Sequence, residues 1–195
     1  MASAPRILAF AGSLRRNSWN KKLARIAADA ARAAGGEVTL LDLADLPMPL
    51  YDGDHEESQG LPENAKRFKR LMMEHSGLLI SCPEYNSSIS AVLKNAIDWA
   101  SRQEAGETPL QCFDGKVAAL LAASPGALGG LRGLVTVRSI LGNIRVLVLP
   151  EQLAVAKAHE AFTEDGKLKD AKQQASVEAI ARRLVTVVAL LRAGA

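Results

Sequence analysis

The sequence lacks several features that define large classes of protein. No apolar run approaches the ~18–20 residues that cross a bilayer, so we predict no membrane-spanning helix. Aromatic residues make up only 4% of the 195 residues, which gives no row of stacking surfaces for single-stranded nucleic acid. The net charge is +3 and the basic residues are scattered, unlike the concentrated positive surface of a DNA-binding protein. We therefore expect neither a membrane nor a nucleic acid as partner.

Cysteine and histidine are also scarce. His55, His75 and His159 stand apart from cysteines and carboxylates at ligand spacing, so we expect no metal site. Cys82 and Cys112 are the two cysteines, and Cys82 is interpreted as a small buried apolar residue rather than a redox thiol. The N-terminus has no basic start followed by a long apolar centre, as a signal peptide would. A cytoplasmic location is the expectation.

The chain alternates between strand patterns and helix patterns. Its apolar runs are nearly continuous in Val, Ile, Leu and Ala, as in strands covered on both faces: 6–12, 37–43, 77–82, 116–123 and 145–150. Helical spacing appears between and after them, at 19–34, 63–75, 89–102, 130–142 and 168–192. This alternation predicts one α/β domain over 1–195, with a parallel sheet between two layers of helices. A proline-rich, acidic segment, 44–62, is predicted to be a long loop.

Ligands of open parallel sheets bind at the carboxyl ends of the strands, and three of these ends are unusual here. After the first strand, "GSLRRNSWN" offers hydroxyls, amides and charge at the start of a helix, where anions are attracted: Ser13, Arg15, Asn17, Ser18 and Asn20. The chain contains no GxxxxGK[ST], so this is not a Walker A loop. The alternative is a helix capped by Ser18 with two solvated arginines.

The turn after the third strand is "PEYNSS". Pro83 ends the strand, and Tyr85 supplies a flat apolar surface with a polar tip. Together with backbone N–H groups, Asn86, Ser87 and Ser88 could donate to the heteroatoms of a planar ring. The alternative is a rigid corner in which Ser88 caps the next helix.

After the fourth strand, "SPGALGGLRG" contains Gly126, Gly129 and Gly130, which let the backbone approach a ligand closely. With Glu151 some twenty residues later, it also resembles a dinucleotide fingerprint, although GxxGG is not GxGxxG. One phosphate loop and two ring-facing loops fit a single flat phosphorylated ligand. Flavin mononucleotide (FMN) is the natural candidate.

Four segments resemble the signatures of the NADPH-dependent FMN reductase family, which includes flavin, quinone, azo-dye and chromate reductases: "GSLRRNSWNKKLA", "LDLADLPMPLYDGD", "PEYNSSISAVLKNAIDWASR" and "SPGALGGLRG". The resemblance covers about 6–150 and implies a flavodoxin-like doubly wound sheet of order 2-1-3-4-5. It implies phosphate contacts from Ser13, Arg15, Ser18 and Asn20, with a flavin ring held by Pro83, Glu84, Tyr85 and Asn86, then Ser88, and by Ser124 and Gly126 on its other side.

The resemblance implies a reaction in two halves. NADPH or NADH reduces FMN, and a small acceptor such as a quinone, free flavin, azo compound or chromate then takes the electrons. Because the cofactor carries the chemistry, we expect no catalytic acid or base. The chain departs from the family pattern PEYNGS-IPG, since Ser87, Ser90 and Ala91 replace Gly, Pro and Gly, and Ala127 stands where a glycine is frequent. These changes bear on the substrate space beside the ring.

Two other functions are compatible with a fold of this kind. An electron-carrier flavodoxin would hold FMN without a substrate of its own, but such carriers are typically acidic, whereas this chain is not. A phospho-receiver domain needs acidic residues after the first and third strands, where Gly12-Ser13 and Cys82-Pro83 stand instead. The family resemblance also implies a homodimer or homotetramer. Trp99 could lie near a subunit contact or pack within its own chain.

Overall fold

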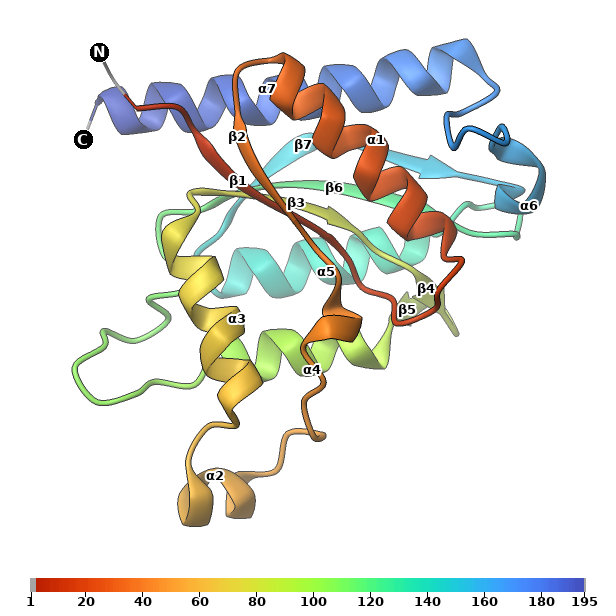
Figure 1. Ribbon diagram of the computed structural model, residues 1–195. Coiled ribbons are helices and arrows are strands. Elements are labelled where there is room, and N and C mark those ends of the chain that lie inside the picture. The colour runs from red at the N-terminus through yellow and green to blue at the C-terminus, as the bar shows by residue number, and fades with distance from the viewer. Residues whose placement is uncertain (1–2, 195) are drawn as a thin grey trace.

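Five parallel strands form the central sheet, in the order β2-β1-β3-β6-β7 (Figure 1). The structure is a computed structural model that describes residues 3–194. The sheet strands are β1 (Arg6–Ala11), β2 (Glu37–Leu41), β3 (Gly77–Ser81), β6 (Val117–Ala123) and β7 (Leu147–Val155). Counted along the chain without the short β4 and β5, this is the order 2-1-3-4-5. The predicted flavodoxin-like fold is confirmed.

Helices cover both faces of the sheet. Figure 1 shows α1 and α7 on one face and α3, α4 and α5 on the other. The helices are α1 (Trp19–Ala33), α2 (Gly53–Gln59), α3 (Glu63–Glu74), α4 (Ala91–Ala100), α5 (Leu131–Asn143), α6 (Ala158–Ala161) and α7 (Ala171–Ala193), with a short 3-10 turn at Leu43–Asp45. Each face of the sheet has its own hydrophobic cluster, one shared with α1 and α7 and the other with α3, α4 and α5. Because both faces are covered, the strand patterns read as continuous rather than alternating.

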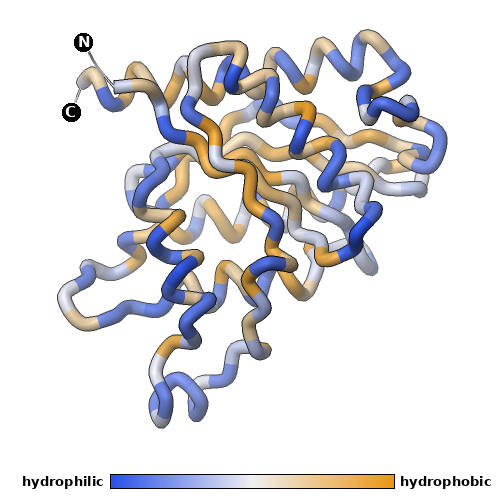
Figure 2. Tube along the Cα trace, viewed as in Figure 1, coloured by the Kyte–Doolittle hydropathy of each residue, from blue (hydrophilic) through white to orange (hydrophobic). Residues whose placement is uncertain are grey.

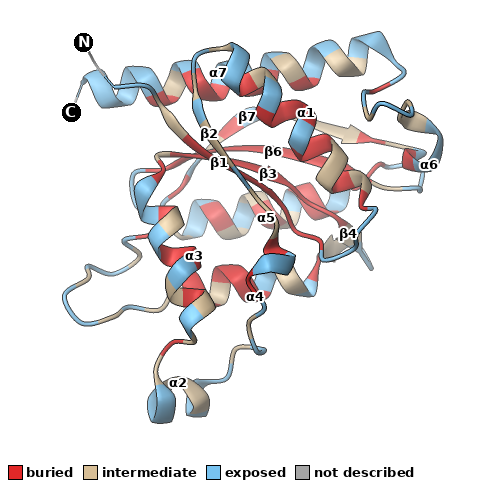
Figure 3. Ribbon diagram, viewed as in Figure 1, coloured by how far each residue is buried: buried red, intermediate tan, exposed pale blue. Residues whose placement is uncertain are grey.

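Burial follows the position of each strand in the sheet. The central strands β3 and β6 are buried along their whole length, whereas the edge strand β2 is only partly covered. Figure 2 shows that the strands at the centre of the protein are hydrophobic, and Figure 3 shows that the same strands are buried. The sheet is therefore a rigid base, and its carboxyl edge presents the loops that follow β1, β3 and β6.

We predicted that the fifth sheet strand ends at Pro150, and this prediction is wrong. Strand β7 continues to Val155, and its pairing with β6 shifts between Ala118 and Leu120. Pro150 has no N–H to donate to a ladder, so an irregularity at an edge strand is the usual solution. As a result, Glu151 lies inside β7, 3.9 Å from Arg183. An acidic residue that binds the ribose of a dinucleotide follows a strand, whereas Glu151 lies within one. The interpretation of this segment as a dinucleotide fingerprint is therefore wrong.

The helix predicted over 89–102 begins later than expected. Residues Glu84–Tyr85 (β4) and Ser88–Ile89 (β5) pair as a small antiparallel hairpin, and α4 begins at Ala91. Its N-cap is Ser90, whose Oγ accepts from the Leu93 N–H at 3.2 Å. The alternative in which Ser88 caps this helix is wrong, because Ser88 belongs to the hairpin. The last helix likewise begins at Ala171 rather than at 168, with Asp170 as its N-cap.

The segment predicted as a loop over 44–62 contains the short helix α2, which Figure 1 shows projecting from the body of the protein. Trp99 packs beneath this segment. Its side chain is fully buried, its ring meets Tyr51 edge to face at 5.1 Å, and its Nε1 donates to the Pro49 carbonyl at 2.8 Å. Of the two positions left open for Trp99, packing within its own chain is the one observed.

The histidines and Cys82 lie in helices or in the packed interior of the protein. His75 is buried and its ring nitrogens lie 2.7 Å from the Leu71 carbonyl and 2.8 Å from Thr39 Oγ1, while His55 lies in α2 and His159 in α6. Cys82 is buried, and burial raises the pKa of its thiol, which fits an apolar packing role. Within 3–194, His, Cys, Asp and Glu side chains form no group of three that could hold a metal ion. Over the same residues, no helix is long and apolar enough to cross a membrane.

Candidate active site

The three unusual strand-end loops meet in one cleft at the carboxyl edge of the sheet. The cleft has a volume of about 250 Å³. In Figure 1 the loop after β1 runs beside the β4–β5 hairpin before it enters α1. The predicted residues that line the cleft are Ser13, Arg15, Ser18, Asn20, Pro83, Glu84, Tyr85 and Ser124, joined by Trp19, Ala123 and Pro125, which the sequence did not single out.

Four predicted residues lie elsewhere. Asn17 and Gly126 are exposed in the loops beside the cleft and do not line it. Asn86 and Ser88 line a neighbouring hollow between α4 and α5, which shares Tyr85 with the cleft. Tyr85, 54% exposed, thus stands between the two spaces.

One end of the cleft, where we predicted phosphate contacts, is built on the start of α1. Ser18 is the N-cap and its Oγ accepts from the Lys21 N–H at 3.4 Å, while Ser13 Oγ accepts from the Arg15 N–H at 3.3 Å. The guanidinium of Arg15 lies 5.6 Å from the centre of the Trp19 ring and pairs with no acidic side chain among residues 3–194. Hydroxyls, a free cation and the unpaired N–H groups of a first helical turn therefore converge here.

Asn20 lines the cleft, and its side chain also holds this end in place. It is buried, its Nδ2 donates to the Ala123 carbonyl at 2.8 Å, and its Oδ1 accepts from the Ala123 N–H at 3.0 Å and from Ser81 Oγ at 2.9 Å. These bonds tie α1 to the carboxyl ends of β3 and β6. We infer that Asn20 positions the loop, a role that its place in the sequence does not reveal.

A second tie joins the first loop to the helix after the hairpin. Ser90 Oγ donates to the Gly12 carbonyl at 2.6 Å, in addition to capping α4. Gly12 is needed at this contact, because a Cβ there would lie 2.8 Å from Leu93 Cβ. Ser90 thereby links the loop after β1 to α4.

The hairpin turns through two residues with left-handed backbone, Asn86 (φ +50°) and Ser87 (φ +66°). Two-residue hairpins with positive φ at both positions favour Asn-Gly, as in the pattern PEYNGS that this stretch resembles, whereas this chain has Ser87. A serine in this conformation carries a steric cost that glycine avoids.

Replacing Ser87 by glycine should therefore raise the free energy of unfolding by about 0.5–1 kcal/mol, because relief of the left-handed strain exceeds the added freedom of the unfolded chain. Chemical denaturation of the two proteins measures the difference. Ser176 provides the control, since it lies within α7. There the same change should be destabilising, and a stabilisation at both positions would contradict the explanation.

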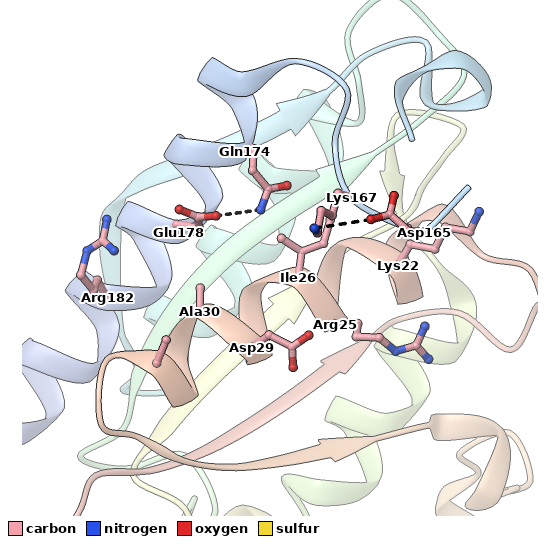
Figure 4. A pocket seen from close by; sticks show the side chains of 12 residues that line it. Lys22, Arg25, Ile26, Asp29, Ala30, Asp165, Lys167, Gln174, Glu178 and Arg182 are labelled. Carbon is pink, nitrogen blue, oxygen red and sulfur yellow. Dashed lines mark hydrogen bonds and ion pairs between the residues drawn. The ribbon is translucent and has the colours of Figure 1, made fainter. Parts of the chain in front are cut away.

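A larger hollow, about 460 Å³, lies away from this edge, between α1, α7 and the turn around Gly166 (Figure 4). Its rim mixes acidic, basic and amide side chains: Lys167 pairs with Asp165 at 3.5 Å, and Gln174 Nε2 donates to Glu178 Oε1 at 2.8 Å. Its lining residues come from α1, α7 and the turn 165–167, and none of the three predicted strand-end loops reaches it. We place the active site in the smaller cleft, where the chemistry of the side chains converges.

Comparison with known proteins identifies the family of the chain. The sequence profile of the family described as NADPH-dependent FMN reductase matches residues 5–160. The chain belongs to this family. It is therefore an enzyme that uses FMN as cofactor and a reduced nicotinamide nucleotide as electron donor, which decides against an electron-carrier flavodoxin.

Individual relatives cover nearly the whole chain. It is 35% identical to an NAD(P)H-dependent FMN reductase of Pseudomonas aeruginosa over 91% of this chain and 92% of the relative. It is 33% identical to a quinone reductase of Pseudomonas putida over 99% and 100%. Among solved structures, the flavoenzyme NAD(P)H:(acceptor) oxidoreductase of Paracoccus denitrificans superposes with a TM-score of 0.79 at 26% identity, covering 95% of this chain and 97% of that one.

Proposed function

We propose that this flavoenzyme holds FMN in the cleft described above and passes electrons from NADPH or NADH to a quinone. The observation that carries the proposal is the meeting of the three loops in one cleft, with phosphate donors at one end and flat apolar side chains at the other. The relatives named quinone reductase support the acceptor class.

The donor set of the cleft fits the phosphate of FMN. Ser13 and Ser18 offer hydroxyls, Arg15 offers an unpaired guanidinium, and the first turn of α1 offers N–H groups. Asn17, exposed in the same loop, would add its amide. Such a set prefers FMN to riboflavin, which has no phosphate.

The opposite end fits a planar ring. Pro83, Tyr85 and Pro125 bring apolar surfaces from the two loops that flank the cleft, and they would exclude water from the ring. We propose that the backbone of residues 83–86 faces one edge of the ring and that Ser124 and Gly126 bound it on the other side. Asn86 and Ser88, beyond Tyr85, are placed to meet the acceptor. When bound, FMN would accept two electrons from the nicotinamide and release them to the acceptor.

The function is tested with purified protein, first for FMN uptake and then for NADPH oxidation with a panel of acceptors. We expect a yellow FMN complex and rapid oxidation with a benzoquinone, with free flavin, azo dye and chromate as the comparison acceptors. FMN binding without NADPH oxidation by any acceptor would contradict the proposed reaction. Faster turnover with one of the other acceptors would overturn the choice of quinone alone.

Tyr85 provides a sharper test of the ring end. Replacing it by alanine should weaken binding of FMN or of the acceptor by about 1–3 kcal/mol, the scale of a lost aromatic contact, whereas Tyr85→Phe should keep most activity. Titrations and both half-reaction rates measure the effect. Tyr51 packs on Trp99 outside the cleft, so Tyr51→Ala should not change the FMN affinity of the folded protein. Unchanged binding and rates in Tyr85→Ala would contradict the proposed ring site.

We also propose that the enzyme is a homodimer or homotetramer. Leu128 in the loop before α5, and Leu131 and Val135 one turn apart on α5, support this, because they are 50%, 42% and 63% exposed. An apolar group of this kind is typical of an interface. Light scattering should give a mass well above the 20.7 kDa of one chain, and a monomer at micromolar concentration would refute the assembly.

A reducing compartment such as the cytoplasm is proposed as the location. Cys82 and Cys112 are free and buried, and burial raises the pKa of the Cys112 thiol to about 11. Neither cysteine forms a disulfide, which is the state that a reducing compartment maintains.

A further inference from the structure

The side chain of Glu84 leaves the cleft and binds the first turn of α5. Its Oε1 accepts from Arg132 Nε at 3.1 Å and from Arg132 Nη2 at 2.9 Å, and its Oε2 accepts from the Gly133 N–H at 3.0 Å. The carboxylate is only 8% exposed, although Arg132 is 57% exposed. These three hydrogen bonds hold the Glu84 carboxylate against the first turn of α5.

This contact joins the two loops that flank the ring end of the cleft. Glu84 belongs to the hairpin that carries Tyr85, and Arg132 and Gly133 directly follow the loop that contains Ser124 and Pro125. The hairpin and α5 pack closely, since a Cβ on Gly133 would lie 3.3 Å from the Ser88 carbonyl oxygen and 3.4 Å from Glu84 Cβ. The distance between the two loops is thus set by this packing and by the ion pair.

The contact also sets the charge beside the cleft. Burial alone would raise the pKa of Glu84, but the hydrogen bonds from Gly133 and Arg132 outweigh it and lower the pKa. The carboxylate is therefore ionised at neutral pH, and its charge is balanced by Arg132 and by the positive end of the α5 dipole. Removing either partner leaves an uncompensated charge of known sign next to the ring end.

We propose that Glu84 and Arg132 are a pair of positioning residues that fix the ring end of the cleft and keep its local charge close to neutral, which tunes how readily bound FMN is reduced. The inference rests on the proposed FMN site. Reduction adds electron density to the flavin, so a nearby uncompensated anion should oppose it and an uncompensated cation should favour it.

The test compares Glu84→Gln, Arg132→Leu and the double variant at pH 8. Titration with oxidised FMN and with dithionite-reduced FMN gives the ratio of the two affinities, and equilibration with a reference dye gives the potential. Each single variant should weaken oxidised FMN about 10-fold through loss of a charged hydrogen bond. Because both substitutions break the same contact, the double variant should bind FMN only slightly more weakly than either single variant.

The direction of the change in reduction potential separates charge tuning from a simple loosening of the FMN site. Relative to wild type, Glu84→Gln should shift the reduced-to-oxidised affinity ratio toward reduced FMN several-fold, Arg132→Leu should shift it the opposite way, and the double variant should return near wild type. A tenfold change in that ratio is about 30 mV for a two-electron couple. Shifts of the same sign, or none, would overturn the tuning role, and unchanged affinity would overturn the positioning role.

Glu37→Gln is the matched control. Glu37 pairs with Arg6 at 3.5 Å, at the opposite edge of the sheet, and its removal should change neither affinity nor potential. Thermal unfolding confirms that each variant is folded, and half-exposed Arg132 makes Arg132→Leu the safer of the single variants. A wild-type protein that binds no FMN would overturn the proposed function together with this inference, whereas normal wild-type binding with unaltered variants would overturn the inference alone.

Discussion

Replacing Asn20 by alanine should lower the free energy of unfolding by about 2–4 kcal/mol. The substitution leaves the buried N–H and carbonyl of Ala123 and the Ser81 hydroxyl without their partner, and each orphaned group costs about 1–3 kcal/mol before relaxation or water entry reduces the sum. Because the same bonds fix the start of α1, FMN affinity should fall as well. Denaturant unfolding and an FMN titration measure the two effects.

The neighbouring amide offers a control for this prediction. Asn17 is exposed, so Asn17→Ala should change the free energy of unfolding by less than about 0.5 kcal/mol. If Asn20→Ala unfolded within that same margin of wild type, the hydrogen bonds that tie α1 to the ends of β3 and β6 would not carry the stability assigned to them.

Replacing Arg15 by alanine should weaken FMN binding by about 1.5–3 kcal/mol and leave riboflavin binding almost unchanged. The guanidinium has no acidic partner among residues 3–194, so it is available for a charge-assisted hydrogen bond to the phosphate. Parallel titrations with the two flavins give the difference, since only FMN carries the phosphate. The exposed position of Arg15 means that the melting temperature should hardly change.

Arg25 is the matched control for Arg15. It lies on α1 but lines the hollow between α1 and α7 rather than the cleft (Figure 4). Arg25→Ala removes the same charge from the helix that follows the Arg15 loop and should leave the difference between FMN and riboflavin intact. A loss of discrimination in both variants would point to the overall field of the helix instead of a direct phosphate contact.

Local sequence information determined the elements that form the sheet and its ligand edge. Strands such as β3 and β6 are continuous apolar runs because both their faces are covered, and the start of α1 is marked by Ser18, whose side chain caps it. The strand order came from the family motifs, since apolar patterns do not say which strands are neighbours. Element boundaries failed where one residue fits two local roles, as with Ser88, which can cap a helix or close a hairpin.

The tertiary structure alone decided what the polar side chains of the site bind. Asn20 reads as a ligand donor in the sequence, yet its partner Ala123 stands 103 residues away and meets it only at the sheet edge. Glu84 reads as part of the ring turn, but its carboxylate meets α5, 48 residues later. The sequence by itself determined the fold class, the family and the three loops that meet at the sheet edge, because these depend on local pattern. Hydrogen-bond partners depend on which segments the folded sheet brings together, so the division between residues that bind and residues that position appears only in three dimensions.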